Sequence, residues 1–307
     1  MKAVILLNMG GARNKKELSL FLKNMFNDKN IITMKSKIFR SLLASFIVSR
    51  RLDESWKNYE KIGGCSPIYE FSDKLKKKLQ SKLGKEYYVT YAMRYTPPFA
   101  KDVLLELEEK KIKDVIFLPL YPHYSTTTTK SSLEDFDGLF DSSYSQKTIE
   151  PFYKDEKYNQ VIIDEIKKNL NNQSDYNIIF SAHALPQKII KNGDPYQSHI
   201  QEEVKILQKM LDKQNIKYKS VSLAYQSKLG PIKWLEPSLG TRLKELKKQK
   251  VIIYPISFII DNSETKFELS VEYKEVAEEC EIKDYIVCAC PNDKDDFVAK
   301  LIDLLKN

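Results

Sequence analysis

The sequence predicts an α/β fold built on parallel sheets. Seven apolar runs rich in β-branched and aromatic residues alternate along the chain with amphipathic, helix-like segments, an order typical of parallel sheets flanked by helices. Several of these runs are apolar almost throughout, as strands buried on both faces are. With 307 residues, the chain is long enough for two domains.

The predicted elements follow in chain order. We expect strands at Ala3–Gly10, Tyr87–Tyr95, Asp114–Pro122, Asn177–His183, Ser220–Ser227, Val251–Ile259 and Asp284–Cys290. Amphipathic helices are expected at Lys101–Lys113, Gln201–Gln214 and Ser238–Lys248, and in the final segment, 291–307. Residues 131–157 are polar and show no strong strand. The first three strands and the last four therefore form two groups, which predicts domains over 1–149 and 150–290.

Charge and composition exclude several classes of protein. The formal net charge is +8, with Lys and Arg often beside Asp and Glu, which indicates solvated helix faces and no nucleic-acid site. No apolar run reaches 18 residues, so no transmembrane helix is expected. The apolar start is too short for a secretion signal, which predicts a cytoplasmic protein. The four cysteines form no C-x-x-C pair, which argues against disulfides and metal-ligand spacing.

Several catalytic motifs are absent. The chain contains no G-x-G-x-x-G, P-loop, G-x-S-x-G or H-E-x-x-H, which argues against nicotinamide enzymes, ATPases, elbow-type serine hydrolases and zincins. Ligands of open α/β sheets bind beyond the carboxyl ends of the strands. His183 and Glu264 lie at two such ends, and histidine is both the commonest metal ligand and the usual near-neutral base. His199 lies near a helix start and is expected at the surface.

An acidic row follows the second of these strand ends. Glu264, Glu268 and Glu272 repeat every four residues, so on a helix they share one face. Such a row leading away from a strand end suits the transfer of protons or hard cations. The alternative is an ordinary solvated acidic face.

The strand-end motifs resemble the ferrochelatase family, whose members insert ferrous iron into a porphyrin at the end of haem synthesis. The matching stretches occur in family order and span nearly the whole chain: VILLNMGG, NYEKIGGCSPIYE, YAMRYTPPF, LPLYPHYSTTTTKSSL, FSAHALPQKIIKNGDPY, LAYQSKLGPIKWLEP and DNSETKFELSVEYKEVAEEC. The S-A-H-A-L-P…G-D-P-Y element and the Y-Q-S-x-x-G-P-x-x-W-L element are highly specific in combination.

The resemblance implies two Rossmann-like, chelatase-type domains with the active-site cleft between them. It also places the C-terminal helix, 291–307, with the first domain. His183 and Glu264 match the family's catalytic, iron-contacting residues, and Glu268 and Glu272 match the acidic row that continues from them. The positions that match residues lining or closing over the porphyrin are Met9, Arg51, Tyr59, Ser66, Arg94, Tyr95 and Trp234.

These residue types fit the chemistry. Two pyrrole protons must leave as Fe²⁺ enters, and a neutral imidazole can accept a proton or bind iron. The sequence leaves open which of the two His183 mainly does. Arg51 and Arg94 are suited to pair with the propionates, the alternative being exposed surface arginines. No cofactor is expected beyond the Fe²⁺ substrate.

The chain departs from the family pattern at a few positions. Asn262 stands where the family commonly has a histidine, and Lys130 stands where it usually has a glycine. Some members carry a C-terminal iron–sulfur extension, which this sequence lacks, so we expect no cluster. Residues 32–51 are apolar and basic with no acidic residue, which suits peripheral membrane contact. The alternative for this segment is an ordinary amphipathic docking helix.

The leading hypothesis is a ferrochelatase that acts on protoporphyrin IX. Met9 favours this substrate, because the coproporphyrin III branch of the family often has tyrosine before that glycine. Three alternatives stay open: coproporphyrin III as substrate, a chelatase that inserts cobalt or nickel into another tetrapyrrole, and a non-catalytic porphyrin or haem carrier on the same fold.

Overall fold

The structure, a computed structural model, describes residues 1–228 and 230–306. Its contacts divide the chain into two compact units. Unit 1 comprises Met1–Tyr121, Ser125–Glu150 and Leu301–Asn307, and unit 2 comprises Pro122–Tyr124 and Pro151–Lys300. Of the segment predicted to return to the first domain, 291–307, the part before Leu301 groups with unit 2, because Phe297 packs against Tyr158 and Lys300 pairs with Asp155 at 2.5 Å.

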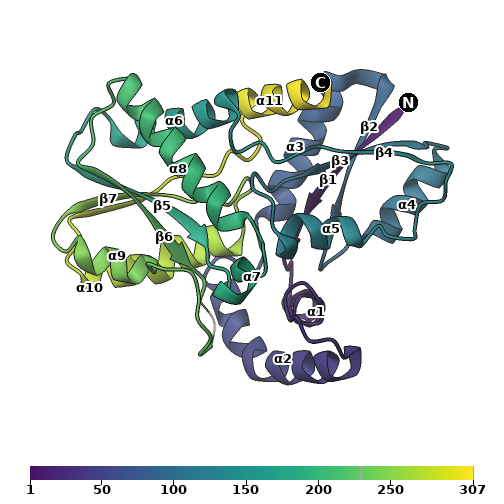
Figure 1. Ribbon diagram of the computed structural model, residues 1–307, viewed down its shortest axis with the longest axis horizontal. Helices are drawn as coiled ribbons and strands as arrows, with labels where there is room; N and C mark the ends of the chain where they lie inside the picture. Colours follow the sequence, from purple (N-terminus) through teal and green to yellow (C-terminus); the bar gives the residue numbers. More distant parts are fainter. Residues whose placement is uncertain (229, 307) are drawn as a thin grey trace. The chain divides into compact units, whose positions relative to one another are not determined.

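Unit 1 contains a four-stranded parallel sheet in the order β2-β1-β3-β4 (Figure 1). The strands are β1 (Lys2–Asn8), β2 (Tyr87–Met93), β3 (Asp114–Pro119) and β4 (Ser145–Thr148). The helical elements are α1 (Lys15–Phe26), α2 (Lys37–Glu60), α3 (Ile68–Leu83), the 3₁₀ helix η1 (Gly84–Glu86), α4 (Ala100–Glu109), the π-helix η2 (Thr126–Lys130) and α5 (Ser131–Glu134). The central strand β1 is buried from Ala3 to Leu7, which explains its continuous apolar run.

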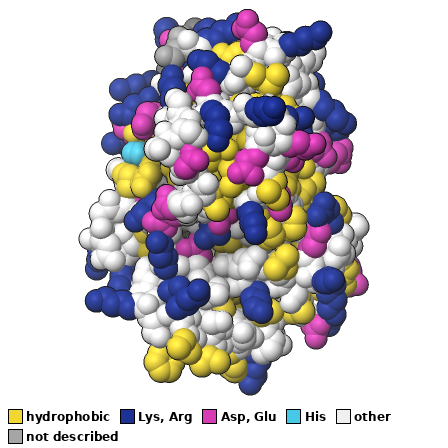
Figure 2. Space-filling view, turned by 90° about the vertical axis from the view of Figure 1, so that its right-hand side faces the viewer, with side chains coloured by type: hydrophobic (Ala, Val, Ile, Leu, Met, Phe, Trp, Pro, Cys, Tyr) yellow, Lys and Arg dark blue, Asp and Glu magenta, His cyan; other side chains and the backbone are white. Residues whose placement is uncertain are grey.

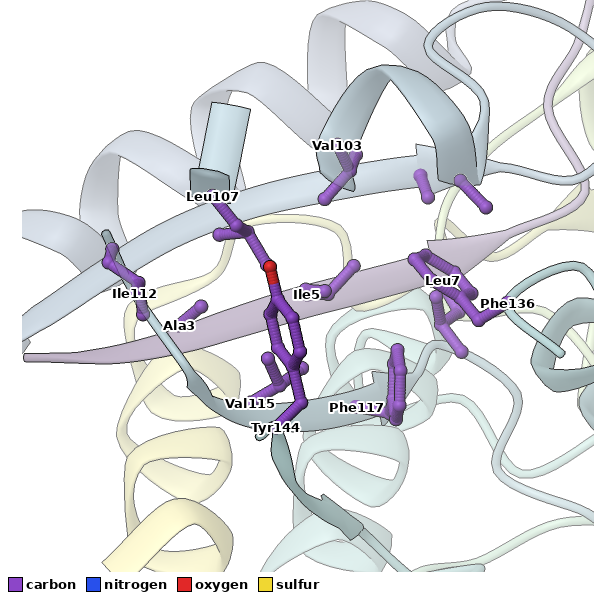
Figure 3. Close-up of a cluster of buried hydrophobic side chains, with 12 residues drawn as sticks. Ala3, Ile5, Leu7, Val103, Leu107, Ile112, Val115, Phe117, Phe136 and Tyr144 are labelled. Atoms are coloured by element: carbon purple, nitrogen blue, oxygen red, sulfur yellow. The ribbon is translucent and has the colours of Figure 1, made fainter. Parts of the chain in front are cut away.

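One side of this sheet forms a hydrophobic core (Figure 3). Alternate residues of β1, Ala3, Ile5 and Leu7, point into it, as the two-residue period of a strand requires. Val103 and Leu107 of α4 cover them from above. The core is completed by Ala92, Ala100, Ile112, Val115, Phe117, Phe136 and Tyr144.

Unit 2 repeats the same sheet with the order β6-β5-β7-β8. Its strands are β5 (Tyr176–His183), β6 (Ser220–Gln226), β7 (Lys250–Tyr254) and β8 (Asp284–Val287). The helical elements are α6 (Glu156–Leu170), α7 (Gln187–Lys191), α8 (Tyr196–Lys213), α9 (Leu239–Glu245), the π-helix η3 (Glu264–Glu272), α10 (Tyr273–Glu279) and α11 (Asp295–Lys306), which runs on into unit 1. The seven predicted strands correspond to β1 to β3 and β5 to β8.

The strand β4 lies within residues 131–157, for which the sequence predicts no strong strand. It is a four-residue edge strand that pairs in parallel with β3, from Asp114 with Ser145 to Phe117 with Thr148. Its residues Ser145, Gln146 and Lys147 are exposed. An edge strand that is open to solvent needs no apolar run, so its sequence carries no hydrophobic signal.

The shared strand order makes positions in the two units comparable. Asp114 pairs with the first residues of β1 and β4, and Lys250 pairs with the first residues of β5 and β8. Lys2 of β1 therefore corresponds to Tyr176 of β5. Counting an equal number of residues along both strands, Met9 of unit 1 occupies the position of His183 in unit 2.

Candidate active site

The candidate site of unit 2 lies at the carboxyl edge of its sheet. His183 ends β5, Gln226 ends the neighbouring β6, and Glu264 begins η3 in the segment that follows β7. Parallel strands end at one edge of a sheet, so the chain brings these three polar side chains together there.

His183 and Glu264 are in direct contact. Nδ1 of His183 lies 2.8 Å from Oε2 of Glu264. The two side chains are 36% and 31% exposed, so solvent and a ligand can reach both. The contact at Nδ1 directs the other ring nitrogen, Nε2, away from the carboxylate, and this nitrogen is the one available for a proton or a metal.

A hydroxyl joins this pair to a second carboxyl group. Ser227 Oγ hydrogen-bonds Glu264 Oε2 at 3.2 Å and also Glu268 Oε2. Gln226 donates from Nε2 to Glu268 Oε2 at 3.0 Å and accepts from Ser181 Oγ at 2.7 Å. Ser227 has a φ of 66°, which is uncommon outside glycine. This backbone strain, at a side chain that contacts two carboxyl groups, is typical of a functional site.

The charges of the site shift its ionisation. Burial opposes a charged imidazole, but the carboxylate of Glu264, which is also its hydrogen-bond partner, and then Glu268 outweigh this effect and raise the pKa of His183. Burial also opposes ionisation of Glu264, yet the charge of His183 and hydrogen bonds from His183 and Ser227 hold the pKa of Glu264 below its ordinary value. Burial and the neighbouring charge of Glu264 raise the pKa of Glu268 to about 7. The site therefore favours an ionised Glu264 beside a Glu268 that titrates near neutrality.

The helix that carries the acidic row is a π-helix from Glu264 to Glu272, a form that is rare and frequently found at functional sites. Asn262 precedes it, and its Oδ1 accepts from the backbone N–H groups of Glu264 at 2.8 Å and Thr265 at 3.3 Å. The amide therefore satisfies two otherwise unpaired N–H groups at the helix start. Glu272, the last residue of the predicted row, is exposed.

Trp234, the remaining predicted site residue of unit 2, lies beside the histidine motif. It forms an isolated antiparallel bridge with Pro186, which follows Leu185 in the S-A-H-A-L-P element. Trp234 and Gln187 also line a cavity of about 450 Å³, together with Lys228, Gly230, Pro231, Ile232, Lys233 and Glu236. Both polar and apolar side chains line this cavity, which suits an amphipathic ligand.

The other predicted porphyrin-lining residues belong to unit 1 and gather near the end of β1. Met9 is half-buried, and its carbonyl accepts from the N–H of Tyr95 at 3.0 Å. Tyr59 and Ser66 are buried and both contact the backbone of Ala12, at 3.3 Å and 2.8 Å. Gly10 has a φ of 91°, and a Cβ there would lie 2.2 Å from Thr96 Oγ1, which explains why this position is glycine.

The two arginines differ in their surroundings. Arg94 is held by Asp135 at 3.0 Å and Asp28 at 3.4 Å, and it donates from Nε to Ser131 Oγ at 2.9 Å. Arg51, in α2, has no ion pair with any described residue. Tyr95 is fully buried and donates to Asp28 Oδ2 at 2.9 Å. These contacts give Arg94 and Tyr95 supporting roles within unit 1, and their contact with a porphyrin stays a prediction.

Sequence reasoning missed several residues of the site. The sequence places Gln226 and Ser227 only at the end of a predicted strand, and its strand-end pattern does not single out Tyr196 and Ser257, which contact the backbone of His183. The G-D-P-Y element that accompanies S-A-H was the available signal for Tyr196. His199 is also not simply a surface residue, because its ring stacks on Tyr153 at 4.4 Å and its Nδ1 accepts from the N–H of Tyr124 at 3.3 Å. Over the described residues, no three His, Cys, Asp or Glu side chains are arranged to hold a metal ion.

Comparison with known proteins gives one consistent result. The family model described as Ferrochelatase matches residues 1–307. A protein named Ferrochelatase from Sulfurimonas denitrificans is 49% identical over 308 residues, which cover 99% of this chain and 98% of the relative. Another of that name from Nitratiruptor sp. is 50% identical over 309 residues, with 99% of each covered.

Solved structures of similar fold are more distant in sequence. SirB from Bacillus subtilis with Fe³⁺ matches with a TM-score of 0.60 at 10% identity, over 99% of this chain and 94% of that one. The sirohydrochlorin chelatase SirB from the same species in complex with cobalt matches with a TM-score of 0.59 at 9% identity, over the same shares. At this identity the likeness supports the chelatase-type fold only.

Proposed function

This chain belongs to the ferrochelatase family, and from that premise we propose that it inserts Fe²⁺ into protoporphyrin IX, giving protohaem and two protons. The chain is thus a metal-inserting lyase of haem synthesis. The observation that carries the site assignment is the contact of 2.8 Å between His183 Nδ1 and Glu264 Oε2. The porphyrin cleft between the two domains stays a prediction.

The proposed mechanism gives the two residues complementary tasks. The carboxylate of Glu264 accepts a hydrogen bond from Nδ1–H of His183 and so holds the neutral ring in the tautomer whose Nε2 has a free lone pair. That lone pair can bind the incoming Fe²⁺ or accept a pyrrole proton, and Glu264 stabilises the imidazolium that proton transfer creates. Glu268, linked to Glu264 through Ser227, is the next group along the proposed proton or metal path, and the exposed Glu272 ends it.

The proposed substrate is supported at two positions of unit 1. Arg94 is already neutralised by Asp28 and Asp135, whereas Arg51 has no such partner among the described residues. The guanidinium of Arg51 is therefore available to pair with a propionate. Met9, half-buried at the end of β1, adds an apolar contact for the vinyl-bearing porphyrin.

The test is metal insertion under anaerobic conditions. The purified chain is supplied with Fe²⁺ and either protoporphyrin IX or coproporphyrin III, and metalation is followed by absorbance. We expect a higher kcat/KM with protoporphyrin IX. Faster turnover of coproporphyrin III would assign the chain to the other branch. Porphyrin binding without turnover in either arm would contradict the enzymatic proposal and favour a carrier.

We also propose that α2 contacts a membrane surface. Over the described residues, no helix is long and apolar enough to cross a membrane. The side chains of Ile38, Phe39, Leu42 and Phe46 are all more than half exposed, and hydrophobic side chains gather at the lower end of the view in Figure 2, where Figure 1 shows α2. Residues 32–51 contain only basic charges, which suits anionic lipid headgroups.

Vesicle binding tests this contact. Phe39→Ser with Phe46→Ser should weaken binding to phosphatidylglycerol-containing vesicles by about 10-fold or more, because burying one Phe side chain contributes about 1.5–3 kcal/mol. Leu105→Ser is the matched control, since Leu105 is equally exposed but lies on α4. Equal vesicle binding by the wild type and the double variant would contradict the proposal.

We propose further that the enzyme needs no resident cofactor. Cys280, Cys288 and Cys290 are buried and Cys65 is exposed, and burial raises the pKa of the Cys288 thiol, which disfavours the thiolate that metal binding needs. Acid-labile sulfide and iron analysis of the purified chain should find less than one iron–sulfur cluster per molecule. A stoichiometric cluster would contradict this proposal.

A further inference from the structure

Both backbone groups of His183 are held by side-chain hydroxyls. The N–H of His183 donates to Ser257 Oγ at 3.0 Å. The carbonyl of His183 accepts from the hydroxyl of Tyr196 at 2.9 Å. The two hydroxyls therefore hold the backbone of the predicted catalytic histidine through both of its polar groups.

The two bonds agree in their proton count. Ser257 Oγ accepts the proton of the His183 N–H, and Tyr196 donates its single hydroxyl proton to the carbonyl of His183. Removing either hydroxyl leaves one backbone group of His183 without this partner.

Both hydroxyls belong to segments of unit 2 that further contacts hold in place. Tyr196 is the first residue of α8, is 6% exposed, and its N–H is held by Asp194 Oδ1 at 3.0 Å. Its ring packs edge-on against His123 with centroids 6.0 Å apart, and His123 Nε2 lies 2.6 Å from the buried Glu203 of α8. Ser257 follows β7 by three residues, and the neighbouring Ile256 N–H donates to Ser181 of β5 at 3.0 Å.

From this geometry we propose that Tyr196 and Ser257 are positioning residues that fix the backbone of His183 and thereby the place of its imidazole. The inference rests on the proposed function, in which Nε2 of His183 faces the substrate. With the backbone held on both sides, only the two side-chain torsions of His183 remain free, and Glu264 fixes these through Nδ1. A small displacement of a catalytic group can cost a large part of the rate.

The kinetics of single and double variants test the positioning role of Tyr196 and Ser257. Tyr196→Phe and Ser257→Ala should each lower kcat by about 3–10-fold, the effect of one lost hydrogen bond, with KM for the porphyrin unchanged. The losses in the double variant should combine to less than their product, because both hydroxyls hold the same residue. Ser257→Thr keeps the hydroxyl and should restore most of kcat. Tyr158→Phe is the matched control, since the Tyr158 phenol is fully buried and its hydroxyl has no partner among the described residues.

A second measurement does not depend on turnover. The chain has three histidines, so ¹⁵N-histidine spectra of the full-length apo protein resolve them, with His183→Ala identifying the relevant signals. Ser257→Ala should shift the His183 imidazole signals and leave those of His199 in place. Wild-type kcat in both single variants, losses that multiply in the double variant, or unmoved His183 signals would each overturn the proposal. If the wild type proved inactive, the spectra would still decide whether Ser257 positions the imidazole of His183.

Discussion

At the scale of single residues, the site combines one imidazole with two carboxyl groups whose pKa values are shifted in opposite directions. Ser227 has one proton to donate, yet its hydroxyl contacts both Glu264 and Glu268. When Ser227 donates to one carboxylate, the other contact requires a protonated carboxyl group as donor. The pKa of Glu268 is raised to about 7, so below neutral pH Glu268 is the group that can carry this proton.

His183→Ala tests the central assignment. We expect kcat to fall by about 10²–10⁴-fold, the usual contribution of a positioned proton acceptor, with little change in porphyrin binding. Metalation of protoporphyrin IX and a porphyrin fluorescence titration measure the two effects. His199→Ala serves as the control, because His199 lies on α8 and contacts Tyr153. Turnover of His183→Ala at the wild-type rate would refute the proposed mechanism.

Glu268→Gln tests the ionisation of the second carboxyl group through stability. Below about pH 4.5 the carboxyl group of Glu268 is protonated in both the folded and the unfolded state. Between pH 4.5 and 7 only the folded state keeps this proton. The stability of the wild type therefore falls as the pH rises through about 7 and the folded state loses the proton. Glu268→Gln has no carboxyl group to ionise at this position, so it lacks this loss of stability. Its free energy of unfolding relative to the wild type should therefore increase from pH 5 to pH 8, on the order of 1 kcal/mol for this partly exposed side chain.

Urea unfolding at the two pH values measures this difference. Glu272→Gln is the matched control on the same helix, because Glu272 is exposed. A pH-independent difference between Glu268→Gln and the wild type would show that Glu268 titrates alike in both states.

At the scale of elements, the start of η3 decides where Glu264 stands. Asn262 Oδ1 accepts from two backbone N–H groups of the helix start, and the N–H of Asn262 donates to Thr265 Oγ1 at 3.0 Å. Asp261, which is buried, accepts from Thr265 Oγ1 and Asn292 Nδ2, each at 2.8 Å. The asparagine at the position where the family commonly has histidine therefore has a structural task at this helix start.

Asn262→Ala should lower the free energy of unfolding by about 1 kcal/mol, the usual cost of a lost helix cap. It should also lower kcat, because the loosened helix start carries Glu264. Chemical unfolding and metalation assays measure the two effects. Asn262→Asp keeps the accepting oxygen and adds a favourable charge at the helix N-terminus, so it should retain wild-type stability. Equal losses in both variants would contradict the capping role.

At the scale of the whole molecule, two units with the same strand order each have a core of their own. Ile5 belongs to the core of unit 1 and Ile253 to that of unit 2, and both are fully buried. The shared order places Met9 and His183 at corresponding positions, so the same strand end presents a thioether in one unit and an imidazole in the other. Only unit 2 has a carboxylate row beside that position, among the described residues.

Ile5→Ala and Ile253→Ala should each lower the free energy of unfolding by about 2–5 kcal/mol, because each leaves a cavity in a packed core. Native-state hydrogen exchange should accelerate first in β1 to β3 for Ile5→Ala and in β5 to β7 for Ile253→Ala. Leu105→Ala, at an exposed position, is expected to cost less than about 0.5 kcal/mol. Uniform acceleration of exchange in both sheets by either core variant would argue against separate cores.

Burial decided which parts of the fold and of the site could be predicted from the sequence. The strands of both sheets except β4 were evident, because a strand buried on both faces must be apolar throughout, whereas the exposed edge strand β4 has no such pattern. The helix predicted at Gln201–Gln214 begins earlier, at Tyr196, because the aromatic residue of its first turn faces the sheet edge. Arg94 was expected to meet a propionate, and nothing local in the sequence reveals its two aspartate partners.

The sequence by itself determined the α/β class, the positions of seven strands along the chain, the family and the polar residues at the strand ends, because periodicity and short motifs are local properties of the chain. The tertiary structure alone decided which of those residues meet. The contacts of His183 with Glu264, of Ser227 with two carboxyl groups, and of Tyr196 and Ser257 with the backbone of His183 mostly join segments far apart in sequence. They form because parallel strands deliver their carboxyl ends to one edge of a sheet, and no local pattern records which side chains reach one another there.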